Sequence, residues 1–219
     1  MTYSSVIFDL DGTLLDTLAD IASTCNDVLA YHNYPPHPTI AYKTFVGDGL
    51  QSLIRKITPV DTEESVIHQC CSIFIEQYSR NWLRNTCPYE GIGDMVSALK
   101  KHGIKLAVLS NKPHEFTEKF VEQFFPRGLF TLVYGQRDGF PKKPDPTVAL
   151  EITRLLGVRP QDSLFVGDSA VDILTGRAAG MATAGVAWGF RTVQELTENK
   201  ANIIVHHPLE LQNHVLSTT

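Results

Sequence analysis

The sequence predicts an α/β protein in which a doubly wound parallel sheet carries an inserted all-helical segment. Short, continuously apolar runs alternate with amphipathic helical stretches along most of the chain, and one long stretch shows helical periodicity alone. Strands that are covered on both faces are continuously apolar, and regular alternation of strands with helices produces a parallel sheet. With 219 residues, the chain can form one large domain that carries a smaller one.

The strands of this sheet are expected in six short apolar runs, at residues 6–8, 106–109, 131–134, 164–166, 184–187 and 203–205. Apolar residues at helical spacing lie between these runs, for example Phe116 and Phe120. Another helix is predicted to have Asp145 as its N-cap, to begin at Pro146 and to end at Gly157.

Residues 16–85 interrupt this alternation and are expected to form an all-helical cap. No convincing strand lies there, but apolar residues recur at the spacing of one helix face in two places: Leu18, Ile21, Ala22, Cys25 and Leu29, and Ile67, Cys70, Phe74 and Tyr78. The core is therefore expected to consist of residues 1–15 and 86–219. Because the insertion follows the first strand, the cap should cover the carboxyl end of the sheet, where open α/β sheets bind their ligands.

The composition excludes several classes of partner. The chain has 19 Lys and Arg residues against 24 Asp and Glu residues, a net charge of −5, so it lacks the basic surface that binds nucleic-acid phosphates. No signal peptide and no run of ~18 apolar residues is present, so we expect a cytoplasmic protein without a membrane partner. The four cysteines lack the Cys-x-x-Cys spacing of zinc and redox sites and are expected to be reduced. The sequence makes no prediction about the oligomeric state.

The strongest chemical motif directly follows the first apolar run and reads Asp9, Leu10, Asp11, Gly12, Thr13. Two carboxylates that are two residues apart can face one cavity once the chain leaves extended geometry. Gly12 allows the unusual backbone that such a turn requires. A plain Asp-Gly turn between a strand and a helix is the structural alternative.

Three further polar motifs lie at the ends of later predicted strands or before a predicted helix. Ser110 and Asn111 follow one apolar run, Lys143 precedes a helix, Asp168 follows another run, and Asp172 comes four residues later. Each motif alone fits a helix cap, a turn or a loop. Their order and their placement at one edge of one sheet instead favour a shared site.

These four motifs, in this order, resemble those of the haloacid dehalogenase superfamily, in particular its phosphatases with a helical cap of the C1 type. The resemblance extends from Asp9 to about Gly185 and looks closest to the phosphoglycolate phosphatases. The caps of those enzymes carry a Gly-x-Gly turn after an aromatic and an aliphatic residue, and this turn resembles the segment Phe45, Val46, Gly47, Asp48 and Gly49. The resemblance implies that Gly47, Asp48 and Gly49 contact the substrate.

The resemblance also implies a metal site and a nucleophile. Mg²⁺ would be held by the side chains of Asp9 and Asp168 and by the backbone carbonyl of Asp11, with Asp172 as an acceptor for metal-bound water. Asp9 would be the nucleophile that forms an aspartyl-phosphate. Asp11 would protonate the leaving alcohol and later deprotonate the attacking water.

The remaining motif residues are expected to bind and neutralise the phosphate. By resemblance, Ser110 and the backbone N–H groups of Gly12 and Asn111 would bind the transferring oxygens. Lys143, which has the family's Lys-Pro pairing, would neutralise charge on the nucleophile and on the phosphate. Thr13 is expected to form a hydrogen bond within its turn and so orient the nucleophile.

The expected function is therefore Mg²⁺-dependent hydrolysis of a small phosphate monoester similar to phosphoglycolate, and the expected partner is a small phosphorylated metabolite. A sugar phosphomutase of the same superfamily shares these roles and is an alternative; it would move a phosphoryl group between sugar positions without releasing phosphate. A pyrophosphatase of the superfamily is a further alternative. A dehalogenase is disfavoured because that branch lacks the second aspartate, which here is Asp11.

Overall fold

The computed structural model describes residues 3–217 and contains a six-stranded sheet. The strand order is β5 (Leu132–Gln136), β4 (Lys105–Pro113), β1 (Ser5–Phe8), β6 (Ser163–Gly167), β7 (Ala182–Val186) and β8 (Ile203–Val205). Every neighbouring pair in this sheet is parallel. The predicted parallel α/β fold is confirmed, and each predicted apolar run overlaps one of these strands, although the runs 131–134 and 184–187 each extend one residue beyond theirs.

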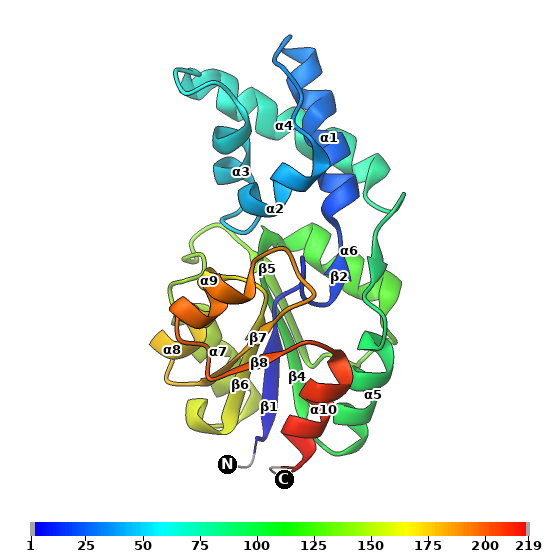
Figure 1. Ribbon diagram of the computed structural model, residues 1–219, viewed down its shortest axis with the longest axis vertical. Helices are drawn as coiled ribbons and strands as arrows, with labels where there is room; N and C mark the ends of the chain where they lie inside the picture. Colours follow the sequence, from blue (N-terminus) through cyan, green and yellow to red (C-terminus); the bar gives the residue numbers. More distant parts are fainter. Residues whose placement is uncertain (1–2, 218–219) are drawn as a thin grey trace.

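Helices cover both faces of the sheet. The side chains of a strand alternate between the two faces, so a continuously apolar strand presents apolar side chains to the helices on each face. On β1, Ile7 packs in one apolar cluster with α7 (Thr147–Leu156), whereas Val6 and Phe8 pack in another with α5 (Ile92–Lys101). The remaining helices of this part are α6 (His114–Phe124), α8 (Ala170–Ala178), α9 (Val193–Glu198) and α10 (Pro208–Ser217), as Figure 1 shows. No helix within residues 3–217 has the length and apolar character needed to cross a membrane.

Helix α7 begins one residue later than the sequence predicts. Pro146 lies at its N-cap position, and the carboxylate of Asp145 accepts a hydrogen bond from the N–H of Thr147 at 2.9 Å. The predicted end at Gly157 is confirmed. This glycine has a φ of +64°, a left-handed conformation that is common directly after a helix.

The helical insertion lies between two short strands, β2 (Leu15–Asp16) and β3 (Cys87–Pro88), which pair antiparallel. It contains α1 (Leu18–Tyr31), a 3₁₀ turn (Thr39–Ala41), α2 (Tyr42–Phe45), α3 (Leu50–Ile57) and α4 (Glu64–Asn81). We call the segment from α1 to α4 the cap. Figure 1 shows it beyond the carboxyl ends of the sheet strands. The sequence did not reveal β2 and β3, because two residues are too few to show a period.

Asp20 of α1 connects the two ends of the cap. Its carboxylate accepts hydrogen bonds from the N–H and side-chain amide of Asn85 and from the N–H and hydroxyl of Thr86, at 2.8 to 3.0 Å. Burial raises the pKa of Asp20, but these hydrogen bonds outweigh burial and hold the pKa below its usual value. One carboxylate therefore ties the chain entering the cap to the chain leaving it.

Candidate active site

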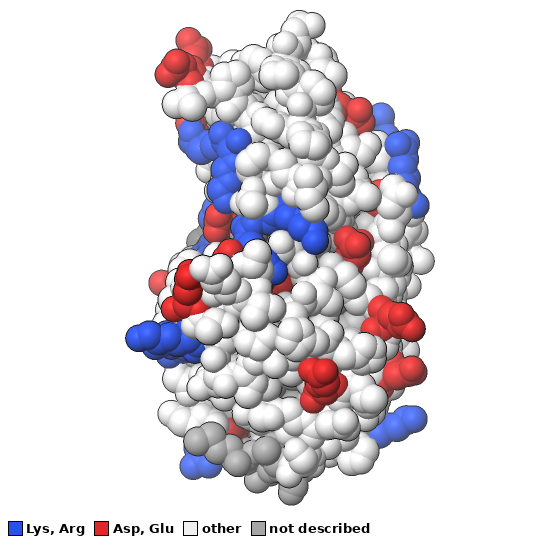
Figure 2. All heavy atoms as spheres, viewed as in Figure 1, with Lys and Arg blue, Asp and Glu red and all other residues white. Residues whose placement is uncertain are grey.

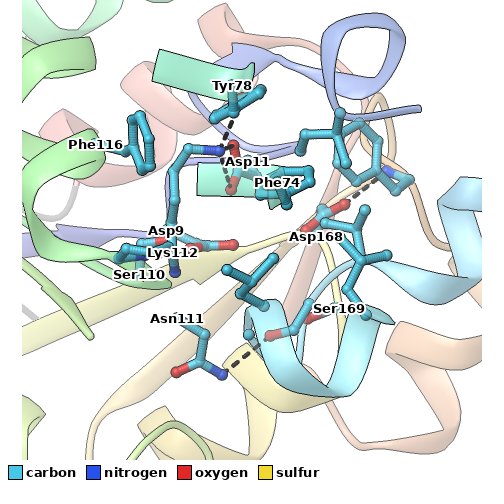
Figure 3. Close-up of a pocket in the computed structure, with 18 of the residues that line it drawn as sticks. Asp9, Asp11, Phe74, Tyr78, Ser110, Asn111, Lys112, Phe116, Asp168 and Ser169 are labelled. Atoms are coloured by element: carbon cyan, nitrogen blue, oxygen red, sulfur yellow. Dashed lines mark hydrogen bonds and ion pairs between the residues drawn. The ribbon is translucent and has the colours of Figure 1, made fainter. Parts of the chain in front are cut away.

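The predicted acidic residues converge at the carboxyl ends of β1 and β6 (Figure 3). These two strands are neighbours in the sheet, and the N–H of Asp9 donates to the carbonyl of Val166 at 2.9 Å. Asp9, Asp168 and Asp172 are all buried, and each places a carboxylate oxygen within 4.8 Å of the other two. Such a group of hard oxygen ligands could hold a divalent cation.

Burial and mutual repulsion oppose the ionisation of these carboxylates. Burial raises the pKa of Asp9 to about 7; the nearby Lys143 counteracts this rise, and Asp172 adds to it. The pKa of Asp168 lies well above its usual value because of burial, then because of Asp172 and Asp9. A divalent cation among these oxygens would favour their ionised forms.

Lys143 is the cation that contacts the predicted nucleophile. Its Nζ lies 2.8 Å from Asp9 Oδ1 and 2.6 Å from Asp172 Oδ1, and the side chain is buried. Burial lowers the pKa of Lys143, but Asp172 and Asp9 outweigh it and raise the pKa above the usual range. The adjacent Lys142 instead reaches the backbone carbonyl of Asp48 at 3.3 Å, so the two neighbouring lysines have different partners.

Asp172 has protein partners for both of its oxygens. Oδ1 binds Lys143, while Oδ2 accepts hydrogen bonds from the N–H and hydroxyl of Ser169, at 3.1 and 2.7 Å. The bond from the Ser169 N–H belongs to a capping box at the start of α8, in which the N–H of Asp172 also donates to the Ser169 side chain. Asp172 therefore positions Lys143, and its predicted contact with metal-bound water stays a prediction.

The turn after Asp9 departs from one predicted contact. The N–H of Gly12 donates to the carbonyl of Leu15 at 2.9 Å, and its predicted bond to a phosphate oxygen stays a prediction. The hydroxyl of Thr13 was expected to form a hydrogen bond within the turn, yet it is buried without a hydrogen-bond partner in residues 3–217. The predicted need for glycine at position 12 is confirmed: its φ is +81°, and a Cβ there would collide with the carboxylate of Asp168.

Ser110 and Asn111 lie at the end of β4 and line the same pocket as Asp9. The hydroxyl of Ser110 accepts a hydrogen bond from the N–H of Lys112 at 3.3 Å. The side-chain oxygen of Asn111 accepts from the N–H of Lys143 at 2.9 Å, and its nitrogen donates to the carbonyl of Lys143 at 3.0 Å. Asn111 thus fixes the backbone of the lysine that contacts Asp9.

Asp11 is held by two side chains, one of which the sequence did not identify. The hydroxyl of Thr17 donates to Asp11 Oδ1 at 2.7 Å. The ammonium of Lys112 lies 3.0 and 3.2 Å from the two carboxylate oxygens and donates to the hydroxyl of Tyr78 at 3.1 Å. Lys112 directly continues the predicted Ser-Asn motif, so its position was a usable signal; Tyr78 was expected only to pack in an apolar stripe.

The predicted cap turn contributes to the pocket through its glycines and not through its acidic residue. Gly47 and Gly49 line the pocket. Asp48 does not line it, because the Asp48 carboxylate pairs with Lys56 of α3 at 2.6 Å, where both side chains are partly exposed. The predicted contact of Asp48 with the substrate stays a prediction.

Core side chains bind backbone carbonyls of this cap turn and of helix α2 directly before it. Asn111 donates to Gly47 O at 3.0 Å. The guanidinium of Arg191 donates to the carbonyls of Lys43, Thr44 and Val46, the last two at 3.1 and 2.8 Å. No motif in the sequence around Arg191 identified it as a residue that contacts the cap. These contacts hold the turn against the core.

The pocket between cap and sheet has a polar floor and an apolar wall. The polar side chains come from the strand ends, and the wall includes Ile21, Leu53 and Phe74 of the cap and Phe116 of α6. Figure 2 shows Lys and Arg side chains gathered around the hollow between the cap and the sheet. Positive charge at the mouth of a cleft favours the approach of an anion.

Comparisons with known proteins identify the family of this chain. The family model of the haloacid dehalogenase-like hydrolases matches residues 6–186. A phosphoglycolate phosphatase from Pseudomonas putida is 31% identical over 205 residues, which cover 91% of this chain and 75% of that protein. An N-acetylmuramic acid 6-phosphate phosphatase from Pseudomonas putida is 30% identical over 213 residues, covering 97% and 96%.

The fold is shared with a crystal structure of a candidate phosphoglycolate phosphatase from Lactobacillus delbrueckii subsp. bulgaricus. The TM-score is 0.93 at 30% sequence identity, and the match covers 98% of this chain and 99% of that one. The family match also includes Asp9, Ser110, Lys143 and Asp168, the motif residues that meet in the pocket region. The chain therefore belongs to the haloacid dehalogenase-like hydrolases.

Proposed function

We propose that this protein is a Mg²⁺-dependent phosphatase that hydrolyses a small phosphate monoester through an aspartyl-phosphate. The proposal rests on the contact of 2.8 Å between Asp9 and Lys143, at the edge of the buried carboxylate group of Asp9, Asp168 and Asp172. An anionic phosphate ester requires a positioned nucleophile and positive charge around its oxygens. The family match and the related phosphatases support this reaction class.

The metal would be held by the carboxylates of Asp9 and Asp168 and by the backbone carbonyl of Asp11, all oxygen ligands of the kind that Mg²⁺ prefers. When bound, Mg²⁺ supplies positive charge beside the phosphate oxygens and favours ionised carboxylates. Asp168 is fixed for this role by a hydrogen bond of 2.6 Å from the N–H of Phe190. Asp172 would support the site by holding Lys143.

Asp9 is the nucleophile in this proposal. Its oxygen bonds to phosphorus as the bond between phosphorus and the ester oxygen breaks, and Asp11 gives its proton to the leaving alcohol. Water then attacks the phosphorus of the aspartyl-phosphate, Asp11 takes a proton from that water, and phosphate leaves as Asp9 is restored. Ser110 and Lys143 would bind and neutralise the phosphate oxygens in both steps.

The position of Asp11 supports its role as acid and base. Thr17 and Lys112 hold its carboxylate, and Figure 3 shows it beside Tyr78 and Phe74 of the cap. This is the part of the pocket where the leaving group would lie if the phosphate occupies the floor beside Asp9. A group in that position can reach the ester oxygen for proton transfer.

The substrate would be a small phosphorylated metabolite of the cytoplasm. 2-Phosphoglycolate is the first compound to test, because the Pseudomonas putida phosphoglycolate phosphatase covers most of this chain. The relative that is an N-acetylmuramic acid 6-phosphate phosphatase makes a sugar phosphate the second. Because both relatives are phosphatases, hydrolysis is favoured over phosphoryl exchange.

The proposal is tested by measuring phosphate release from 2-phosphoglycolate, pyrophosphate, pyridoxal phosphate, N-acetylmuramic acid 6-phosphate and β-glucose 1-phosphate, with Mg²⁺ and with EDTA. We expect Mg²⁺-dependent release from at least one monoester, and loss of more than nine tenths of the rate in Asp9→Asn. Full activity in EDTA would contradict the metal assignment. Isomerisation of β-glucose 1-phosphate without phosphate release would identify a mutase instead.

A further inference from the structure

Lys112 is a buried cation in the pocket whose ion pair is with Asp11 and not with the proposed nucleophile Asp9. Its side chain is only 5% exposed, and its Nζ lies over the rings of Tyr78 and Phe120, at 4.9 and 4.8 Å from their centres. Its one anionic partner in the described chain is Asp11, which it contacts through both carboxylate oxygens. A buried ammonium interacts strongly with any further anion that enters the same space.

The other cations near the pocket are already engaged. Among the described residues that line it, only Lys112 and Arg191 carry a permanent positive charge. Arg191 donates to three cap carbonyls and lies 3.6 Å from Glu195. Lys143 is bound by Asp9 and Asp172. Lys112 also has an anionic partner, but that partner is Asp11, so Lys112 is the cation that lies beside the proposed position of the leaving group.

Tyr78 places a hydroxyl donor next to this ammonium. Its oxygen accepts the hydrogen bond from Lys112 at 3.1 Å, so its own proton can be donated to a ligand. Burial raises the pKa of Tyr78 well above its usual value, which keeps the hydroxyl protonated. Two donors this close together can bind the two oxygens of one carboxylate.

The distance from the reacting atoms limits which carboxylate could bind. Asp11, the proposed proton donor to the ester oxygen, is in direct contact with Lys112. In a phosphate ester of a 2-hydroxy acid the carboxylate is bonded to the ester carbon, so it would lie on the side of Lys112 when the ester oxygen meets Asp11. The apolar side chains of Ile21, Leu53 and Phe116 around this space favour a short leaving group.

We propose that Lys112 and Tyr78 bind a carboxylate of the leaving group, so that the enzyme selects phosphate monoesters of small 2-hydroxy acids. This inference rests on the proposed phosphatase function. One ammonium, shared with Asp11, suits a singly charged carboxylate better than a second phosphate, which would need more positive charge. The competing explanation is that Lys112 serves only to hold Asp11.

The test compares 2-phosphoglycolate with its carboxamide, which has the same shape but no charge at the proposed subsite. We expect the wild type to prefer the carboxylate by about tenfold or more in kcat/KM, the effect of one charged hydrogen bond. Lys112→Met should bring this preference close to one, Lys112→Arg should retain part of it, and Tyr78→Phe should reduce it. Lys119→Met, which removes an exposed lysine on α6, should keep the wild-type preference.

The ratio separates the two explanations, because loss of support for Asp11 would slow both substrates equally. An unchanged ratio in Lys112→Met, or no preference in the wild type, would overturn the inference while leaving the phosphatase function intact.

Calorimetric binding of both compounds to Asp9→Asn gives the same comparison without turnover. If no monoester is hydrolysed, the phosphatase proposal fails, and these affinities still decide whether Lys112 recognises a carboxylate. Circular dichroism identifies any variant that fails to fold. If Lys112→Met fails to fold, the preference is measured in Lys112→Arg and Tyr78→Phe instead.

Discussion

The side-chain nitrogen of Asn111 donates a hydrogen bond of 3.0 Å to the carbonyl of Gly47 and so joins the end of β4 to the cap turn. The same amide holds both backbone polar groups of Lys143, at 2.9 and 3.0 Å. A single side chain therefore sets the position of the lysine beside Asp9 and contacts the cap.

Asn111→Ala should lower both stability and activity. The substitution leaves buried backbone groups of Lys143 without partners, so we expect the free energy of unfolding to fall by about 1–3 kcal/mol. We expect kcat/KM to fall by about tenfold to a hundredfold, because Lys143 would lose its fixed position beside Asp9. Urea denaturation and phosphate release measure the two effects.

The matched control for Asn111 is Lys142→Met. It removes only the longer contact of 3.3 Å between the exposed Lys142 and the carbonyl of Asp48. We expect it to change kcat/KM far less than Asn111→Ala does. Equal losses in the two variants would mean that the cap contact, and not the position of Lys143, determines the rate.

Mg²⁺ should stabilise the protein more at high pH than at low pH. Because the pKa of Asp9 is raised to about 7, the folded state binds more protons than the unfolded chain between about pH 4 and pH 7. The contribution of Asp9 to stability is therefore lost as pH rises through that window. A cation that binds the ionised carboxylates should offset the loss, so we expect the rise in Tm with Mg²⁺ to be small at pH 5 and largest above pH 7.

Scanning calorimetry with Mg²⁺ or EDTA at each pH measures this rise in Tm. Asp168→Asn is the control, because it removes a proposed ligand and should greatly reduce the effect of Mg²⁺. A rise in Tm that is the same at pH 5 and pH 8, or that persists in Asp168→Asn, would place the bound ion elsewhere.

Asp48→Ala should leave substrate preference unchanged. Its ion pair with Lys56 is partly exposed, and such pairs contribute ~0–1 kcal/mol to stability. Leu53→Ala, which enlarges the pocket wall, should instead change the ratio of kcat/KM for 2-phosphoglycolate and N-acetylmuramic acid 6-phosphate. If Asp48→Ala changed this ratio more than Leu53→Ala, the ion pair would have to break when the substrate binds.

The sequence was sufficient to predict the sheet, the inserted helices and the meeting of Asp9, Asp168 and Lys143. Apolar runs and helical periods are local patterns, and parallel strands bring their carboxyl ends to one edge. Polar residues that follow such strands must therefore meet, whatever the details of packing. This reasoning required only the order of the elements along the chain.

The partners of individual side chains could not be predicted in this way. The hydroxyl of Thr13 lacks the predicted bond, and Asp48 turns to Lys56, because both depend on how distant segments pack. Tyr78 belongs to a row of apolar residues at helical spacing. This spacing predicted that Tyr78 is buried, but it did not predict the contact of the Tyr78 hydroxyl with Lys112. Contacts across the boundary between cap and core arise only when both parts are folded.

Asp20→Ala should destabilise the protein strongly at neutral pH and less in acid. The Asp20 carboxylate accepts hydrogen bonds from Asn85 and Thr86, so its removal leaves several donors unpaired and should cost about 2–4 kcal/mol. Because its pKa is lowered in the folded state, its stabilising effect is present above about pH 4 and is lost as pH falls below that value. Urea denaturation of wild type and variant at pH 7 and pH 3.5 should show the difference shrinking, whereas Asp27→Ala, an exposed residue of the same helix, should change little at either pH. A difference that stays constant between the two pH values would mean that packing, and not the ionised carboxylate, holds the ends of the cap together.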